Sequence, residues 1–404
     1  MQQFGVDRLF TVFQPIVDLE TREVIAHEAL TRGSLQGETV PPDRLYGDAY
    51  RAGLAAELDD ACISTTLQSA EAQRLSLPGS LFVNVEPSSF LGGRVPAGLL
   101  SAPPMVVEIT ERALTTDPSG LLEAAAALRA AGHLIALDDV GAEPASLALL
   151  PLLAPEIVKL DMGLILGRPD RLSATVMTTI SAYVDESGAA VLAEGIETEK
   201  HIIRARALGA TFGQGWHFGR PDETPRATSG TGIRSRAKRT SATGPAHAAA
   251  TPFVPGCTPF DLVASSAAVR VGDRALLVEV SKLLEDRAAG GGDTSVLLAT
   301  FQSDDNISEA TRLRYEHLVA TGCLLTVYST IASADLPHPA RSVVIDRSDP
   351  LGDEWDVVLL TADYAAALLA REVDASLHEE GNYEFVLTTD RRVVVEAARA
   401  LLTR

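Results

Sequence analysis

The chain has 404 residues, of which 46% are hydrophobic and 22% charged, and this composition excludes a disordered protein. A formal net charge of −20 disfavours binding to nucleic acid, because a surface of that sign repels phosphate. The length exceeds what one core usually organises, so we expect two domains.

Between about residue 9 and residue 221, short β-type runs alternate with segments rich in Ala and Leu, which is typical of a parallel α/β architecture. The predicted strands are Phe10–Val17, Val24–Glu28, Leu81–Val85, Met105–Ile109, Leu134–Asp138, Ile157–Leu160, Ala190–Ala193 and Thr211–Gln214. The predicted helices lie around Asp43–Leu77, Leu121–Ala131, Ala145–Leu152, Ser173–Ser187 and Glu199–Leu208. Polar residues end almost every strand, and a barrel brings such ends to one mouth, so we expect a (β/α)8 TIM-like barrel over residues 1–221.

Residues 222–252 contain almost no large apolar side chains and predict a flexible linker. Its basic cluster of Arg234, Arg236, Lys238 and Arg239 is interpreted as a solvated run rather than a site for an anionic partner.

Residues 253–404 predict a second, smaller α/β domain. The expected helices are Pro259–Ser266, Ala275–Ala289 and Arg392–Leu402, and the expected strands are Ser295–Thr300, Leu324–Ser329, Ser342–Ile345, Trp355–Leu360 and Tyr383–Thr388. This half does not collect acidic residues at strand ends and has no glycine-rich phosphate loop, so sensing or interaction is favoured over catalysis.

The N-terminal sequence MQQFGVDRLFTVFQ has no signal-peptide pattern, and no apolar stretch approaches about 20 residues. The cysteines Cys62, Cys257 and Cys323 lack CxxC spacing, which favours a reducing compartment and disfavours a zinc site. We therefore expect a cytoplasmic protein without a membrane partner.

Polar side chains recur at the ends of the strands predicted in the first half. They are Glu28, Asn84, Glu108, Asp138, Asp139, Lys159, Glu194 and Glu197. Charged groups are seldom found in apolar strands unless they are paired or bind a cation. The pattern predicts an anionic, oxygen-rich site suited to hard divalent cations.

Each of these residues also has a plainer explanation. Glu28 or Glu108 alone could face solvent, and Asp138 and Asp139 could serve a turn. Lys159 could pair with Asp161 at the surface, and Asn84 could be a turn residue. Together these explanations need a coincidence in every unit, so a shared site is favoured.

The first half resembles the EAL domain, the family of cyclic di-GMP phosphodiesterases. The segments that carry the resemblance are FQPIVDLE, HEALTRG, FVNV, VEITE, LDDVG, VKLD, AEGIET and GQGWHFGRP. The resemblance implies hydrolysis of cyclic di-GMP to 5′-pGpG with two Mg²⁺ or Mn²⁺ ions. It implies a homodimer as well.

The resemblance also implies a role for each residue. Glu28, Asn84, Glu108 and Asp138 would bind the metals, with Asp139 serving the second ion, and Lys159 would orient the attacking water. Glu194 would be the general base, and Glu197 and Gln214 would support these groups. Substrate contacts are assigned to Gln14, Arg32, Gln214 and Pro221, and Glu111 would anchor the loop after the acidic pair. Tyr46, Trp216 and Phe218 could stack on guanine or belong to the core.

The chain departs from its relatives after the acidic pair, where Val140 to Leu147 replace a phenylalanine and a glycine-rich loop. Glu143 and Pro144 restrict this loop and add a negative charge. The departure keeps open an alternative function, a catalytically weak or inactive cyclic di-GMP receptor that signals through protein contacts.

Residues 253–404 resemble the DICT domain, a sensory module. The cues are VLLATFQ at 296–302, the strand with Trp355 and the ending FVLTTDRRVVVEAARALL. The resemblance implies that this domain regulates the first and has a signalling partner.

Overall fold

The computed structural model describes residues 4–75, 81–110, 117–142, 146–228, 233, 257–265, 267–302, 308–330, 336–373 and 382–404. The chain divides into two compact units, one of residues 1–143 and 153–248 and one of residues 144–152 and 249–404. Most of the predicted linker, including its basic cluster, lies outside the described residues. Within the described part of the chain, no helix has the length and hydropathy needed to cross a bilayer.

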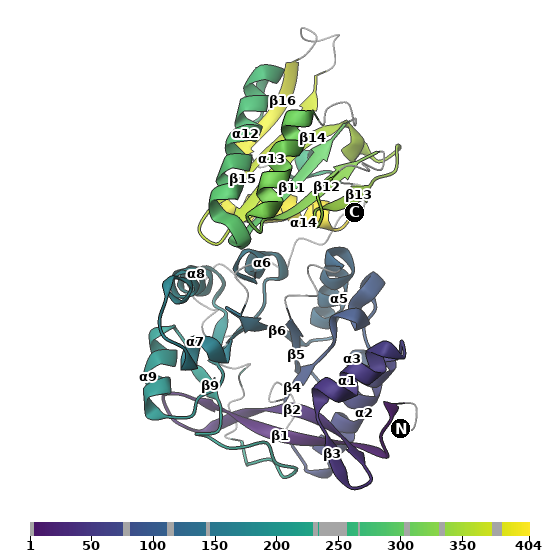
Figure 1. The fold of residues 1–404 in the computed structure, drawn as a ribbon, viewed down its shortest axis with the longest axis vertical. Helices are drawn as coiled ribbons and strands as arrows, with labels where there is room; N and C mark the ends of the chain where they lie inside the picture. Colours follow the sequence, from purple (N-terminus) through teal and green to yellow (C-terminus); the bar gives the residue numbers. More distant parts are fainter. Residues whose placement is uncertain are drawn as a thin grey trace. The chain divides into compact units, whose positions relative to one another are not determined.

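Eight strands close into a barrel in the first unit (Figure 1), which confirms the predicted fold class. The order around the barrel is β1-β9-β8-β7-β6-β5-β4-β2, and pairing of β1 with β2 closes the ring. The strands are β1 Arg8–Asp18, β2 Val24–Leu35, β4 Leu81–Asn84, β5 Val106–Thr110, β6 Leu134–Val140, β7 Ile157–Leu160, β8 Ala190–Ala193 and β9 Phe212–Gln214. A short strand, β3 Glu38–Val40, pairs with the end of β2.

Strand β1 departs from a purely parallel barrel, because it runs antiparallel to both β2 and β9. The connection from Asp18 to Val24 is too short for the crossover that parallel neighbours need, so these two strands form a hairpin. The Asp18 carboxylate accepts backbone hydrogen bonds from Glu20 and Thr21, both at 2.9 Å, and shapes that turn.

The helices of the first unit follow the predicted pattern, except that one predicted segment is divided and the short helices Ala97–Leu100 and Met162–Leu166 were not predicted. They are α1 Pro42–Arg51, α2 Ala55–Ala72, α3 Ala97–Leu100, α5 Pro118–Ala130, α7 Met162–Leu166, α8 Arg171–Ser187 and α9 Glu199–Ala207, and α6 Ser146–Leu153 has most of its residues in the second unit. The single helix predicted over Asp43–Leu77 is wrong, since α1 and α2 are separate. Gly53 between them has a φ of +70°, which a continuous helix does not allow.

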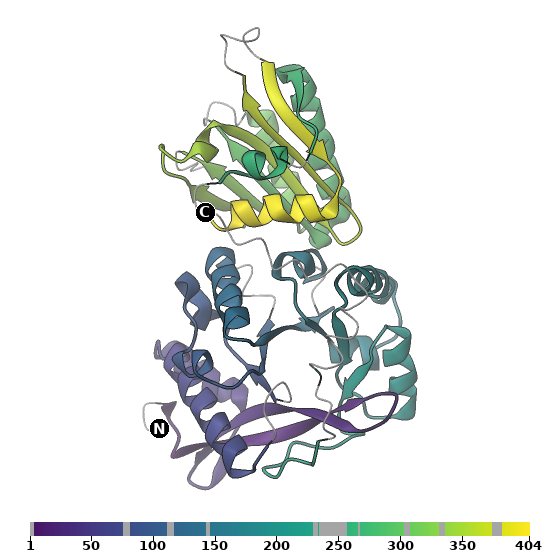
Figure 2. The same cartoon turned by 180° about the vertical axis from the view of Figure 1, so that it is seen from behind.

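The C-terminal domain has a seven-stranded sheet in the order β10-β16-β15-β14-β11-β12-β13. The strands are β10 Arg270–Asp273, β11 Ser295–Phe301, β12 Leu324–Ser329, β13 Arg341–Val344, β14 Glu354–Thr361, β15 Ala365–Glu372 and β16 Asn382–Thr388. Helices α12 Arg274–Gly291 and α13 Glu309–Ala320 cover one face (Figure 1). Helices α11 Pro259–Ala264 and α14 Arg391–Leu402 cover the other (Figure 2).

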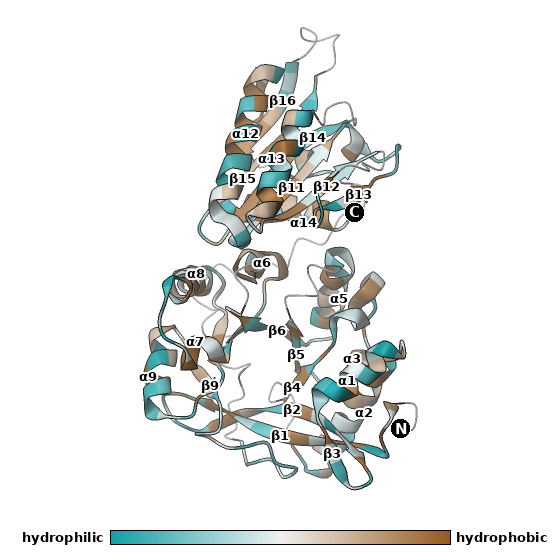
Figure 3. Cartoon of the chain, viewed as in Figure 1, coloured by the Kyte–Doolittle hydropathy of each residue, from teal (hydrophilic) through white to brown (hydrophobic). Residues whose placement is uncertain are grey.

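Helix α12 shows why these segments take their places. Its buried residues are Leu277, Ser281, Leu284, Glu285 and Ala288, a spacing that forms one stripe on a helix. Hydrophobic and hydrophilic residues accordingly alternate along α12 (Figure 3). The strands β10 and β15 and the helix α13 were not predicted. The sequence of β15, AAALLARE, lacks β-branched residues, and its burial in the sheet overrides that low propensity.

Candidate functional site

Each polar residue of the predicted site lies two sequence positions after a residue of the barrel core. The core inside the barrel includes Ala26, Phe82, Val106, Ala136, Ile157, Leu192 and Phe212. Two positions after each of these lie, in the same order, Glu28, Asn84, Glu108, Asp138, Lys159, Glu194 and Gln214. Side chains two positions apart on a strand point to the same side. The barrel therefore brings seven polar side chains together above its apolar interior.

Lys159 lies at the centre of this set, and we call it and the carboxylates around it the acidic cluster. Its Nζ is 2.7 Å from Glu108 Oε1, 2.9 Å from Asp138 Oδ1, 2.8 Å from Glu194 Oε1 and 3.9 Å from Glu28 Oε1. The lysine side chain is 1% exposed. One buried cation thus faces four carboxylates, which leaves the cluster with excess negative charge.

The plainer explanations for Glu28, Glu108 and Lys159 do not hold for this structure. Glu28 is 7% exposed and Glu108 is 1% exposed, so neither is a solvent-facing strand end. Asp161 does not pair with Lys159; its carboxylate accepts a hydrogen bond from Gly163 N and caps α7.

The acidic pair at the end of β6 has a strained backbone. Asp139 has a φ of +56°, a left-handed conformation that is uncommon for residues other than glycine. The turn continues through Gly141, where a Cβ atom would lie 2.5 Å from Leu164 Cδ1. Asp138 Oδ1 accepts a hydrogen bond from Asp139 N at 3.0 Å, so the pair serves both the turn and the cluster.

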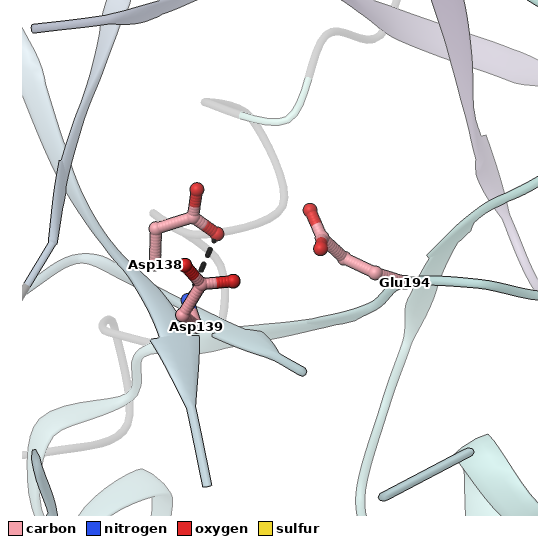
Figure 4. A group of neighbouring side chains, drawn as sticks. All are labelled: Asp138, Asp139 and Glu194. Atoms are coloured by element: carbon pink, nitrogen blue, oxygen red, sulfur yellow. Dashed lines mark hydrogen bonds between the residues drawn. The ribbon is translucent and has the colours of Figure 1, made fainter. Parts of the chain in front are cut away.

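Asp138, Asp139 and Glu194 form a potential cation site (Figure 4). Each offers one carboxylate oxygen, and these oxygens lie within 4.8 Å of one another. Asp138 and Asp139 come from β6, and Glu194 follows β8 directly. Only a folded barrel joins residues so far apart in the sequence.

The ionisation of the cluster reflects burial and mutual charge. Burial raises the pKa of Glu194 to about 8, with Asp138 and Glu28 adding to the shift and Lys159 opposing it. Burial and the neighbouring Glu28 raise the pKa of Glu108 well above its usual range. Burial alone would lower the pKa of Lys159, but the carboxylates raise it, so the lysine stays charged.

Glu28 is held by amide donors from neighbouring strands. Asn84 Nδ2 donates to Glu28 Oε1 at 2.9 Å, and Gln214 Nε2 donates to Glu28 Oε2 at 2.5 Å and to Gln14 Oε1 at 3.1 Å. Burial raises the pKa of Glu28, but Lys159 and the two amides outweigh it and bring the pKa below its usual value. This carboxylate therefore stays ionised.

The remaining residues singled out from the sequence do not lie in the acidic cluster. Arg32 is half-buried and lines a pocket of about 320 Å³ together with Glu28, Asn84 and Tyr46. Pro221 precedes Asp222, whose backbone pairs with Phe13 beside Gln14. Glu111, Glu143 and Pro144 lie outside the described residues.

Glu197 and two predicted aromatic residues are not part of this arrangement. Glu197 is exposed, and among the described residues no contact joins its carboxylate to the acidic cluster. Trp216 is 58% exposed, and the Arg220 guanidinium lies over its ring. Neither Trp216 nor Phe218 lines the pocket that contains Arg32. Of the three aromatic candidates, only Tyr46 lines it.

Asp59 is a site residue that the sequence reasoning missed. It is fully buried in α2 and accepts hydrogen bonds from Tyr46 Oη at 3.0 Å and Glu86 N at 2.9 Å, so it fixes one wall of the pocket. Burial raises the pKa of Asp59 to about 6. The sequence contains a signal for this residue, because a charged Asp59 lies between Leu58 and Cys62 on the apolar face of its helix.

Comparison with known protein families identifies both domains. The EAL domain model matches residues 1–221, more than half of the chain. This chain belongs to the EAL-domain family. The DICT domain, described as a sensory domain in diguanylate cyclases and two-component systems, matches residues 263–373.

Curated relatives share the EAL domain. The cyclic di-GMP phosphodiesterase RocR of Pseudomonas aeruginosa is 30% identical over 233 residues, which are 52% of this chain and 56% of RocR. The probable cyclic di-GMP phosphodiesterase PdeB of Escherichia coli is 27% identical over 220 residues, 51% of this chain and 41% of PdeB. The chain thus spans about half or less of the length of these relatives.

Solved structures also resemble the EAL domain. The PaMucR phosphodiesterase in complex with c-di-GMP has 27% identity and a TM-score of 0.46, and covers 53% of this chain and 91% of its own. The manganese and cyclic di-GMP complex of Klebsiella pneumoniae BlrP1 has 25% identity and a TM-score of 0.45, with coverage of 53% and 56%.

Proposed function

We propose that the EAL domain hydrolyses cyclic di-GMP to 5′-pGpG with two Mg²⁺ or Mn²⁺ ions. The observation that carries this proposal is the acidic cluster, in which three carboxylates on strands and one directly after β8 surround the buried Lys159. The substrate is proposed from the activity named for RocR and PdeB.

The donor set fits hard divalent cations. Its carboxylate oxygens and the amide oxygen of Asn84 are ligands that Mg²⁺ and Mn²⁺ prefer. Lys159 balances only one of the negative charges, so the cluster retains attraction for cations. We assign Glu28, Asn84, Glu108 and Asp138 as ligands, with Asp139 serving the second ion.

The reaction breaks one phosphodiester bond. Bound cations would supply Lewis acidity to the water and the phosphoryl oxygens. Glu194 accepts a proton from the water as the general base. The water oxygen bonds to phosphorus while the bond to the 3′ oxygen breaks, and that oxygen takes up a proton to become the 3′-hydroxyl. Lys159 offsets charge that develops on the phosphoryl group.

We assign the substrate contacts to Arg32, Gln14, Gln214 and Pro221. The pocket beside Arg32, about 320 Å³ in volume, adjoins Glu28 and Asn84 and has room for part of a nucleotide. Burial lowers the pKa of Arg32 while Glu28 raises it, and a guanidinium remains charged in either case. It suits a phosphate oxygen or the polar edge of guanine.

The proposal is tested by chromatography of cyclic di-GMP after incubation with the full-length protein and Mn²⁺ or Mg²⁺. We expect 5′-pGpG, and we expect Glu194→Gln to lower kcat by about 10²- to 10⁴-fold while cyclic di-GMP still binds. Glu199→Gln is the matched control, because the Glu199 side chain is 67% exposed and engages only surface partners, Arg22 and His217.

Binding of cyclic di-GMP without formation of 5′-pGpG would reject hydrolysis and favour the receptor function.

We further propose, from the family resemblance, a homodimer whose DICT domain regulates turnover. Hydrolysis by the full chain and by residues 1–225 should then differ in rate, and the sign of the difference tells whether the DICT domain activates or inhibits.

A further inference from the structure

The DICT domain contains a cavity of about 90 Å³ between its sheet and the helices α12 and α13. Its lining residues come from the carboxyl end of β11, the start of β14, Tyr383 of β16 and the helices α12 and α13. After β11 the chain goes to β12 and β13 on one side and then returns to β14 on the other. Ligand pockets in proteins are concave and lined mainly by apolar and aromatic side chains, with a few polar groups that orient the ligand.

Two aromatic pairs line the cavity. The rings of Trp355 and Tyr383 lie edge to face with centroids 5.7 Å apart, and those of Phe301 and Tyr315 have centroids 6.1 Å apart. Aromatic walls of this kind favour a flat ring over a saturated one, because ring edges and faces attract each other.

The cavity also has a polar group in need of a partner. Ser281 lines it and is 6% exposed, and none of the described residues hydrogen-bonds with its Oγ. A buried hydroxyl without a partner is unfavourable, and a ligand that supplies one recovers the lost interaction.

The charges around the cavity favour a neutral ligand. Glu285, one helical turn after Ser281, is 4% exposed, and its Oε2 accepts a hydrogen bond from Arg314 Nε at 2.5 Å. These two opposite charges balance. Arg274 also lines the cavity but is exposed at its mouth, where water screens the charge.

We propose that this cavity binds a small neutral aromatic alcohol of the phenol class, with its ring between the aromatic pairs and its hydroxyl at Ser281. The cavity volume of about 90 Å³ is smaller than the approximately 150 Å³ of an engineered cavity that holds benzene. The ligand therefore has a single ring, and part of it extends into the mouth of the cavity. Such a ligand would be the signal of the sensory domain. The binding itself does not depend on the proposed phosphodiesterase activity.

Isothermal titration calorimetry of the full-length protein tests the proposal, with phenol as the probe. We expect a single site per chain with a Kd below about 1 mM. Cyclohexanol keeps the hydroxyl without the flat ring, and toluene keeps the ring without the hydroxyl. Each should bind at least about tenfold more weakly.

Two serine variants locate the site. Ser281→Ala should weaken phenol binding about tenfold and raise the Tm of the free protein, because it removes an unpaired buried hydroxyl. Ser295→Ala is the matched control. Ser295 is fully buried on β11 outside the cavity, and no described residue hydrogen-bonds with its Oγ. It should raise the Tm and leave the Kd unchanged.

A fluorescence titration gives a second readout. The chain has two tryptophans, Trp216 and Trp355, so Trp216→Phe leaves only the one in the cavity. Phenol should then change the emission of Trp355, and the titration should give the same Kd as calorimetry.

Absence of phenol binding, equal affinity for cyclohexanol, or an unchanged Kd in Ser281→Ala would overturn the proposal. None of these readouts uses cyclic di-GMP, so their failure is distinct from failure of the proposed hydrolysis.

Discussion

At the scale of single residues, Lys159 explains how a barrel can bury so many carboxylates. An isolated buried carboxylate is costly, and the cost falls when a cation lies among several of them. With Nζ between 2.7 and 2.9 Å from three carboxylates, the lysine stabilises the cluster as well as serving its proposed chemistry.

Lys159→Met should therefore destabilise the protein by about 3 to 5 kcal/mol in the presence of a chelator, because it leaves buried carboxylates without their cation. Mn²⁺ should raise the Tm of this variant more than that of the wild type, since the variant site is more negative. Thermal melting with and without Mn²⁺ measures both effects.

Lys282→Met is the control for that variant. Lys282 is 41% exposed and pairs with Glu279 at the surface, so its loss should cost less than about 1 kcal/mol. Equal destabilisation by the two variants would contradict the stabilising role of Lys159.

At the scale of elements, strand β14 carries two acidic residues on one face of the DICT sheet. Asp356 is fully buried and Glu354 is 3% exposed. Burial raises the pKa of Glu354 to about 7 and that of Asp356 well above its usual range. The side chains of Glu354 and Asp356 hydrogen-bond to each other, and a proton shared between them relieves the repulsion of the pair.

This pair makes the stability of the DICT domain depend on pH. The folded state holds a proton on Glu354 up to about pH 7, whereas the unfolded chain releases it near pH 4.5. The folded state thus binds more protons across that window, and its stability falls as the pH rises from about 4.5 to about 7.

Glu354→Gln should weaken this dependence, and the part that comes from the raised pKa of Asp356 should remain. The difference in Tm between the variant and the wild type should increase in favour of the variant as the pH rises through that window, and it should reach a few degrees near neutrality. Melting curves of both proteins between about pH 5 and about pH 8 give the difference directly. Glu279→Gln, at an exposed carboxylate paired with Lys282, controls for loss of one acidic group. A Tm difference independent of pH would show that the pair holds no extra proton.

At the scale of the whole molecule, the division into two units predicts independent responses to ligands. The acidic cluster belongs to the unit of residues 1–143 and 153–248, and the aromatic cavity to the other unit. A ligand stabilises only the unit to which it binds, by about 2.7 kcal/mol at 100 times its Kd.

Differential scanning calorimetry of the full chain should show two transitions, of which Mn²⁺ raises only one. Lys159→Met should lower the Tm of that same transition, and Glu354→Gln should shift only the other. A single transition that responds equally to Mn²⁺ and to both substitutions would mean that the units unfold together.

The sequence by itself determined the barrel, the family and the side of the barrel on which the polar residues lie. Alternation along each strand is a local property, so Glu108 after Val106 or Lys159 after Ile157 already fixes which way a side chain points. The short link between Asp18 and Val24 would also have predicted the antiparallel start of the barrel.

Only the tertiary structure decided which of these groups meet. Closure of the ring brings Gln14 and Gln214 within a hydrogen bond of each other and places Lys159 among carboxylates from four other strands, while Glu197 remains outside. The cavity beside Ser281 likewise depends on the register of β11 against β14, whose residues lie more than 50 positions apart in the sequence. Such contacts arise from strand order and register, which bring together residues far apart in the sequence.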